Sequence, residues 1–268
     1  MTEVAQELHV TLEVDGGVGW IRFNRPERMN AIGTLARQQL GAAIRAVAKD
    51  ESVRCVVLTG SGRAFCAGAD VREMGQAAGM RTPEDVGRIL RDEYMPQILG
   101  LRQMAKPVIA GLNGVAAGIG ASYAMAADIR IATPSASLVE AFVGIGLMPD
   151  GGASWFLPRL VGMGKAMEMI MTGRPLSAED AERLGLYNQV VPEDSFDTVL
   201  GEWASRLAAG PTRAIAAAKK SVNNAMGAGL EDAMEFESYL QEATAATEDF
   251  QEGVVAFVSK RTPEFKGR

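Results

Sequence analysis

The chain has 268 residues, 47% of them apolar, and a formal net charge of −6, a balance typical of a globular protein that buries its own core. The acidic charge argues against a nucleic-acid-binding surface and against a polybasic lipid anchor. Two cysteines and one histidine, His9, are too few for a disulfide framework, and they argue against structural zinc and Ser-His or Cys-His nucleophiles.

The first third of the chain alternates predicted strands and helices. A strand at residues 18–23 follows the turn Asp15-Gly16-Gly17 and predicts an N-terminal hairpin. Pro107 stops the last helix of this part. The other elements predicted from apolar spacing are a helix over residues 33–49, a buried strand over 53–59 and a helix over about 85–104.

Residues 107–127 contain no charged residue and have the length of a membrane span. The stretch is rich in glycine and alanine and contains Asn113, so we interpret it as a buried strand (107–112), a turn and a helix (119–127). The acidic N-terminus lacks the basic start and apolar stretch of a signal peptide. We therefore expect a cytoplasmic protein.

The remaining elements divide the chain into two parts. Strands are predicted over 129–132 and 137–139 and a helix near 163–172, but from residue 202 only helices follow. Continuously apolar strands that alternate with helices predict an α/β fold with mostly parallel pairing. We expect residues 1–201 to form this core and residues 202–268 a helical region that packs on the core or on another subunit.

Two glycine-containing loops, at residues 64–70 and 113–122, each follow a predicted strand. Small residues let a ligand approach the main chain, and the first N–H groups of a helix have no partner inside it. The N–H groups of Ala69 and Ile119 could converge on one oxygen as an oxyanion hole. The alternative is two tight turns that serve only close packing. The second loop is not a dinucleotide fingerprint, because Tyr123 replaces its third glycine.

Asp150 is the only charged residue between Glu140 and Arg159. Desolvation in such an apolar setting raises the pKa of an aspartate, which can then hold or accept a proton near neutral pH. The alternative is a helix N-cap after a proline turn.

Together these features resemble the crotonase (enoyl-CoA hydratase/isomerase) superfamily over nearly the whole chain. The segments that carry the resemblance occur in the family's order: residues 21–31, the two glycine loops, residues 173–181 and residues 252–268.

The resemblance implies a crotonase-like spiral of ββα units with a C-terminal helical region that builds a homotrimer or a dimer of trimers. It implies an acyl-CoA thioester whose carbonyl oxygen binds the N–H groups of Ala69 and Ile119. Coenzyme A then enters as part of the substrate, with no separate cofactor, no metal, and no nucleic-acid or membrane partner. The residues implied to contact it are Arg28, Ala67, Ala69, Asp70, Val71 and Arg72, with Phe257 and Lys260 from a neighbouring subunit.

Two departures from the family pattern concern the chemistry. Hydratases of the superfamily carry two glutamates where this chain has Ser122 and Phe142. Asp150, however, matches the aspartate of the isomerases that act on ring-1,2-epoxyphenylacetyl-CoA in phenylacetate degradation, and residues 145–160 look especially like that group. The 4-chlorobenzoyl-CoA dehalogenases also have this aspartate, but they add a histidine, for which this chain has no available residue, and a tryptophan at the position that matches Phe142.

We therefore predict an acyl-CoA isomerase in which Asp150 moves a proton. Two alternatives stay open: an enoyl-CoA hydratase that uses Asp150 or Glu140, and a catalytically inactive acyl-CoA-binding protein. Residues 75–100 are expected to shape the acyl pocket.

Overall fold

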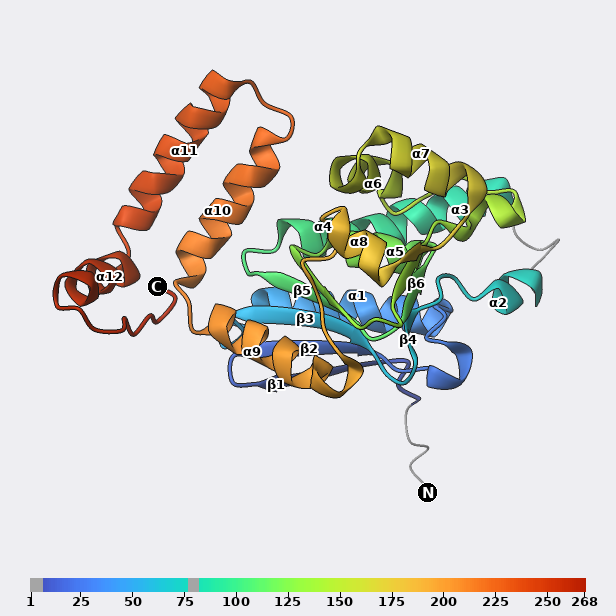
Figure 1. Cartoon of the computed structure of the whole chain (residues 1–268), viewed down its shortest axis with the longest axis horizontal. Coiled ribbons are helices and arrows are strands. Elements are labelled where there is room, and N and C mark those ends of the chain that lie inside the picture. Colours follow the sequence, from blue (N-terminus) through green and yellow to red (C-terminus); the bar gives the residue numbers. More distant parts are fainter. Residues whose placement is uncertain (1–6, 77–81) are drawn as a thin grey trace.

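Two β-sheets organise the chain in the computed structural model, which describes residues 7–76 and 82–268 (Figure 1). The larger sheet has the order β1-β2-β3-β5-β7-β10, and the smaller has the order β4-β6-β8-β9. The strands of the larger sheet are β1 (Val10–Asp15), β2 (Val18–Phe23), β3 (Cys55–Gly60), β5 (Val108–Leu112), β7 (Ile129–Ala132) and β10 (Gln189–Val190). Those of the smaller are β4 (Ala64–Cys66), β6 (Val115–Ala117), β8 (Ser137–Val139) and β9 (Leu176–Ser177).

From β3 to β8, consecutive strands belong alternately to the larger and the smaller sheet. Strands β3, β5 and β7 pair in parallel in the larger sheet, and the strands that follow them, β4, β6 and β8, pair in parallel in the smaller one. Only the hairpin β1–β2 and the pair β8–β9 are antiparallel among the described strands. This repetition confirms the predicted α/β spiral of ββα units.

Helices cover the sheets and form an arm at the C-terminus. Those of the first half are α1 (Thr34–Lys49), α2 (Val71–Gln76), α3 (Pro83–Ile89), α4 (Met95–Gln103) and α5 (Ile119–Ala126). The others are α6 (Ala153–Val161), α7 (Met163–Thr172), α8 (Ala178–Arg183), α9 (Phe196–Ala208), α10 (Thr212–Ala225), α11 (Leu230–Ala245) and α12 (Glu248–Val258). Figure 1 shows α10 and α11 side by side, extending away from the sheets, with α12 at the end of this pair where α10 begins, opposite the α10–α11 turn.

The predicted helix over 85–104 contains a π-helical turn, Leu90–Tyr94, between α3 and α4. The turn ends two residues before Pro96, which has no N–H to donate to the preceding turn. The widened turn keeps α3 and α4 in one continuous helical run.

Helix α9 begins earlier than the sequence predicts. Its buried residues Phe196, Leu200, Ala204 and Ala208 pack against β2, β3 and β5 of the larger sheet. The expected boundary between residues 201 and 202 thus lies within α9, and the division into two parts stays a prediction.

The uncharged stretch 107–127 forms β5, β6 and α5, and all eight residues of α5 are buried. In the part of the chain that the structure describes, no helix combines the length and apolarity required to span a bilayer.

A buried asparagine holds the first glycine loop in place. The Nδ2 atom of Asn30 lies 3.0, 2.7 and 3.3 Å from the carbonyl oxygens of Ser61, Ala64 and Phe65. Its Oδ1 atom accepts the N–H of Arg25 at 2.9 Å. The backbone φ of Asn30 is +59°, a left-handed conformation that asparagine tolerates better than most residues.

We expect Asn30→Ala to lower the free energy of unfolding by about 2–4 kcal/mol, because it leaves several buried backbone groups without partners. Chemical denaturation would measure this loss. Thr59→Val, which removes a single hydrogen bond to the Gly111 carbonyl, is the matched control and should cost clearly less. An equal loss of unfolding free energy in the two variants would contradict the inference that Asn30 holds the first glycine loop in place.

Candidate active site

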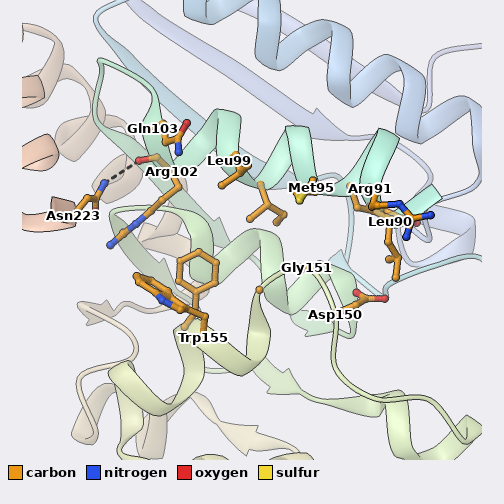
Figure 2. Close-up of a pocket in the computed structure, with 14 residues that line it drawn as sticks. Leu90, Arg91, Met95, Leu99, Arg102, Gln103, Asp150, Gly151, Trp155 and Asn223 are labelled. Carbon is orange, nitrogen blue, oxygen red and sulfur yellow. Dashed lines mark hydrogen bonds between the residues drawn. The ribbon is translucent and has the colours of Figure 1, made fainter. Parts of the chain in front are cut away.

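Two cavities meet at Asp150. The first, here called the loop cavity, has a volume of about 180 Å³ and is lined by the two glycine loops, including Ala69 and Ile119. The second, here called the aromatic cavity, has a volume of about 560 Å³ and is lined by one face of the helical run 90–103 together with Trp155 and Phe156 (Figure 2). Asp150 lines both cavities. The structure therefore brings the three residues expected to carry the chemistry to one place.

The N–H group of Ile119 is free because of its position in a helix. Ile119 is the first residue of α5, directly after Gly118, which caps the helix with φ +52°. The first N–H groups of a helix have no partner within it, and they lie at the positive end of the helix dipole. This amide is therefore available to an oxygen in the loop cavity.

The N–H group of Ala69 is free for a different reason. Ala69 forms an isolated parallel bridge with Ile32, in which Ile32 donates to the Gly68 carbonyl (2.8 Å) and accepts from the N–H of Asp70 (3.0 Å). In this pattern the flanking residues make both hydrogen bonds, so the N–H of Ala69 points to the opposite side. The two loops touch there: a Cβ atom on Gly68 would lie 2.8 Å from the Ala117 carbonyl oxygen.

Asp150 presents an unpaired carboxylate to both cavities. Its Oδ1 atom is buried and has no hydrogen-bond partner among the described residues. Burial raises the pKa of Asp150 to about 6. Helix α6 is capped by Gly152 without a side-chain hydrogen bond, so the alternative interpretation of Asp150 as a side-chain N-cap is wrong. The carboxyl group is free to exchange a proton near neutral pH.

Ser122 and Phe142, which stand where hydratases carry glutamates, make other contacts in this structure. Ser122 is fully buried, and its hydroxyl donates to the backbone carbonyl of Asp150 at 2.9 Å. Phe142 lines the loop cavity, with its ring 3.8 Å from the point where a Cβ of Gly118 would lie. Ser122 thus fixes the Asp150 loop, and Phe142 supplies an apolar wall.

Glu140 is a second buried acid close to this site. It is 0% exposed, and neither carboxylate oxygen has a hydrogen-bond partner among the described residues. Burial, together with the charge of Asp150, raises the pKa of Glu140 to about 7. Glu140 lines neither cavity, so its carboxylate is not placed to touch a ligand in them.

The residues expected to contact coenzyme A fall into three groups. Ala67, Ala69, Asp70 and Val71 line the loop cavity. Arg28 and Arg72 are exposed and line neither cavity. Phe257, which is 86% exposed, lies near the end of α12, and Lys260 follows this helix. Neither residue lines either cavity. Their contribution from a neighbouring subunit stays a prediction.

Asp70 has a structural partner in addition to its place in the cavity. Its carboxylate accepts a hydrogen bond from the Arg25 guanidinium at 3.0 Å and from the N–H groups of Arg72 and Glu73. Asp70 therefore precedes α2 and caps its N-terminus. These contacts hold the main chain beside Ala69.

The sequence did not single out Tyr94, Arg102 or Trp155. Tyr94 is buried and lines both cavities. Of the segment 75–100 expected to shape the acyl pocket, positions 90, 91, 94, 95, 98 and 99 line the aromatic cavity, whereas residues 77–81 lie outside the described part. Spacing of three and four residues along this helix is the only sequence signal that could have indicated the shared face.

The described residues contain no group of three or more His, Cys, Asp or Glu side chains arranged to hold a metal ion. Neither His9 nor Cys66 lines either cavity.

Comparison with known proteins agrees with this architecture. Residues 13–268 match the family model described as enoyl-CoA hydratase/isomerase. A "Probable enoyl-CoA hydratase" of Rhodobacter capsulatus is 42% identical, with 97% of this chain and 98% of that protein covered. A "1,2-epoxyphenylacetyl-CoA isomerase" of Escherichia coli is 38% identical, with 95% and 97% covered.

A solved structure of an enoyl-CoA hydratase from Bacillus anthracis superimposes with a TM-score of 0.91 at 33% identity, covering 97% of this chain and 100% of that one. A spiral of ββα units with these loops defines a crotonase-fold enzyme. The chain belongs to the enoyl-CoA hydratase/isomerase family.

Glu140 generates a stability prediction. Its folded-state pKa of about 7 lies above the ordinary value of 4.5, so the folded state retains a proton that the unfolded chain has already lost. The free energy of unfolding therefore falls as pH rises from about 4.5 through 7. We expect Glu140→Gln to raise the free energy of unfolding by about 1–3 kcal/mol near pH 8 and to change it little near pH 4. Thermal denaturation across this range measures the gain, and a gain independent of pH would contradict the assignment.

Proposed function

We propose that this enzyme is an acyl-CoA isomerase that moves a double bond, or rearranges a ring epoxide, through a thioester enolate. The observation that carries the proposal is the position of Asp150, the one acidic side chain among the described residues that lines both cavities. It lies at the junction between the free N–H groups of the glycine loops and the larger apolar space. The coenzyme A moiety is part of the substrate, and no other cofactor is proposed.

The two main-chain N–H groups would act first. Ala69 and Ile119 donate to the thioester carbonyl oxygen, which makes the neighbouring carbon more acidic and stabilises the negative charge of the enolate. Removing one such donor commonly costs about 3–4 kcal/mol of barrier. Because both donors belong to the main chain, their position depends on the close packing of the two loops and not on side-chain rotamers.

Asp150 would then move the proton. Its carboxylate takes a proton from one carbon of the acyl chain and returns it to another, which completes the double-bond shift without a second acid. The raised pKa of Asp150 brings the proton affinity of the group close to neutral pH, where both steps are feasible. The apolar wall of the loop cavity, which includes Phe142 and Leu147, keeps competing water away from the enolate.

A hydratase is the second candidate, because the Rhodobacter capsulatus and Bacillus anthracis relatives carry that name. Hydration needs carboxylates that activate and protonate water, and this chain has Ser122 and Phe142 at the two family positions. The remaining acid, Glu140, lines neither cavity. The name of the Escherichia coli relative supports the isomerase and a substrate from phenylacetate degradation. The homotrimer or dimer of trimers and the cytoplasmic location stay predictions.

We expect Asp150→Asn to reduce double-bond migration in an unsaturated acyl-CoA by at least about a hundredfold, because the amide cannot accept the proton. The shift of the double bond is followed by product analysis at saturating substrate. Glu140→Gln is the matched control, since it removes a neighbouring buried carboxylate outside the cavities. Near-native migration by Asp150→Asn, or rapid loss of enoyl absorbance by hydration in the native enzyme, would contradict the proposal.

The pH dependence of the reaction reports the same group. Only the ionised form of Asp150 accepts a proton, so kcat/KM should fall about tenfold per pH unit below about pH 6 and stay level above it. Initial rates measured across the acidic range give the midpoint of this fall in kcat/KM. A midpoint near the ordinary aspartate value of 3.8 would show that the base is not desolvated.

A further inference from the structure

The aromatic cavity contains a charged group without a partner in the chain. Arg102, near the end of α4, lines this cavity together with Trp155 and Phe156. Its Nε atom is buried, and among the described residues the guanidinium group donates no hydrogen bond to the protein and forms no ion pair. Asp128 is the acid whose charge acts on Arg102, but its carboxylate is already paired with Lys219 at 2.8 Å.

Aromatic rings hold the guanidinium group without using its N–H donors. The central carbon of the Arg102 guanidinium lies 5.8 Å from the ring centroid of Trp155 and 5.7 Å from that of Phe156. Such contacts offset only part of the cost of removing a cation from water. Arginine stays charged under all ordinary conditions. An anion that enters the cavity would therefore meet a half-buried cation with free donors.

Arg102 and Asp150 lie at opposite ends of the residues that line the aromatic cavity (Figure 2). Tyr94 lines both cavities beside Asp150, and Arg102 follows eight residues later on the same helical run, roughly 12 Å along its axis. The side chains between them, Met95 and Leu99, are apolar (Figure 2). An acyl chain whose reacting carbons lie at Asp150 could thus run along these apolar residues toward the arginine.

We propose that the enzyme selects acyl-CoA substrates whose acyl chain ends in a carboxylate, and that Arg102 binds this carboxylate. The inference rests on the proposed acyl-CoA function, because it assumes that the thioester lies at the glycine loops. A carboxylate matches the planar fork of the guanidinium and can satisfy two N–H donors at once. A chain that ends in a methyl group would cover the guanidinium and leave these donors unpaired.

Binding of saturated, unreactive thioesters tests the proposal without turnover. We compare adipyl-CoA with hexanoyl-CoA, and suberyl-CoA with octanoyl-CoA, so that each pair differs only at the chain end. The full-length native protein should bind the carboxylated member of at least one pair about tenfold more tightly or better. In Arg102→Met this preference should disappear, and in Arg102→Lys, which keeps the charge but not the fork, it should shrink.

Arg159→Met is the matched control. Arg159 also lies over Trp155, 4.2 Å from its ring centroid, but it is exposed and does not line the aromatic cavity, so this variant should keep the preference. Equal binding within both pairs by the native protein, or a preference that survives in Arg102→Met, would overturn the inference. If no thioester binds at all, the acyl-CoA function itself fails; if the preference is present but unsaturated esters are not isomerised, only the isomerase assignment fails.

Discussion

The site depends on how closely two turns of main chain approach one another. A Cβ atom on Gly120 would lie 2.3 Å from the carbonyl oxygen of Cys66, and one on Gly68 would lie 2.8 Å from that of Ala117. Only glycine allows these distances without displacement of backbone. The parallel register of β4 with β6 sets the approach, and it brings the start of α5 beside the segment that carries Ala69. The proposed oxyanion hole thus depends on sheet packing.

Desolvation is the second constraint, and it acts on both acids of the site in the same direction. Burial raises the pKa of Asp150 to about 6 and, together with the charge of Asp150, that of Glu140 to about 7. Neither acid has the cationic partner that would lower its pKa, in contrast with Asp70, which accepts a hydrogen bond from Arg25 at 3.0 Å. The same environment that reduces stability at alkaline pH therefore suits Asp150 to the proton transfer that we propose for it. Glu140, which lines neither cavity, lowers stability at alkaline pH in the same way.

Local patterns were sufficient to predict most of the framework. Continuous apolar strands identified β3, β5 and β7, and an isolated charge among glycines identified Asp150. The sequence did not indicate β9 and β10, which are two residues long and depend on strands already in place. It also missed α6, where Pro158 interrupts the expected pattern, and the first turns of α9, whose apolar face becomes evident only against the larger sheet. Arg102 resembles a surface charge in the sequence, because its surroundings come from Trp155 and Phe156 more than fifty residues later.

The two ends of the site, the glycine loops and the Arg102 end of the aromatic cavity, are built from different parts of the chain: main chain at the first and side chains at the second. At the proposed thioester end the groups are main-chain amides, whose positions depend on the packing of the two loops and not on side-chain identity. Changes of single side chains, such as serine at position 122 and phenylalanine at 142, alter the proton chemistry without disturbing that packing, since Ser122 still anchors the Asp150 loop through its hydroxyl. At the distal end, the proposed recognition depends on side chains, chiefly those of α4 and α6, with Asn223 of α10 also lining the cavity. Overall similarity to hydratases and isomerases follows the first end, whereas in our proposal the substrate is selected at the second, where the half-buried Arg102 lines the aromatic cavity.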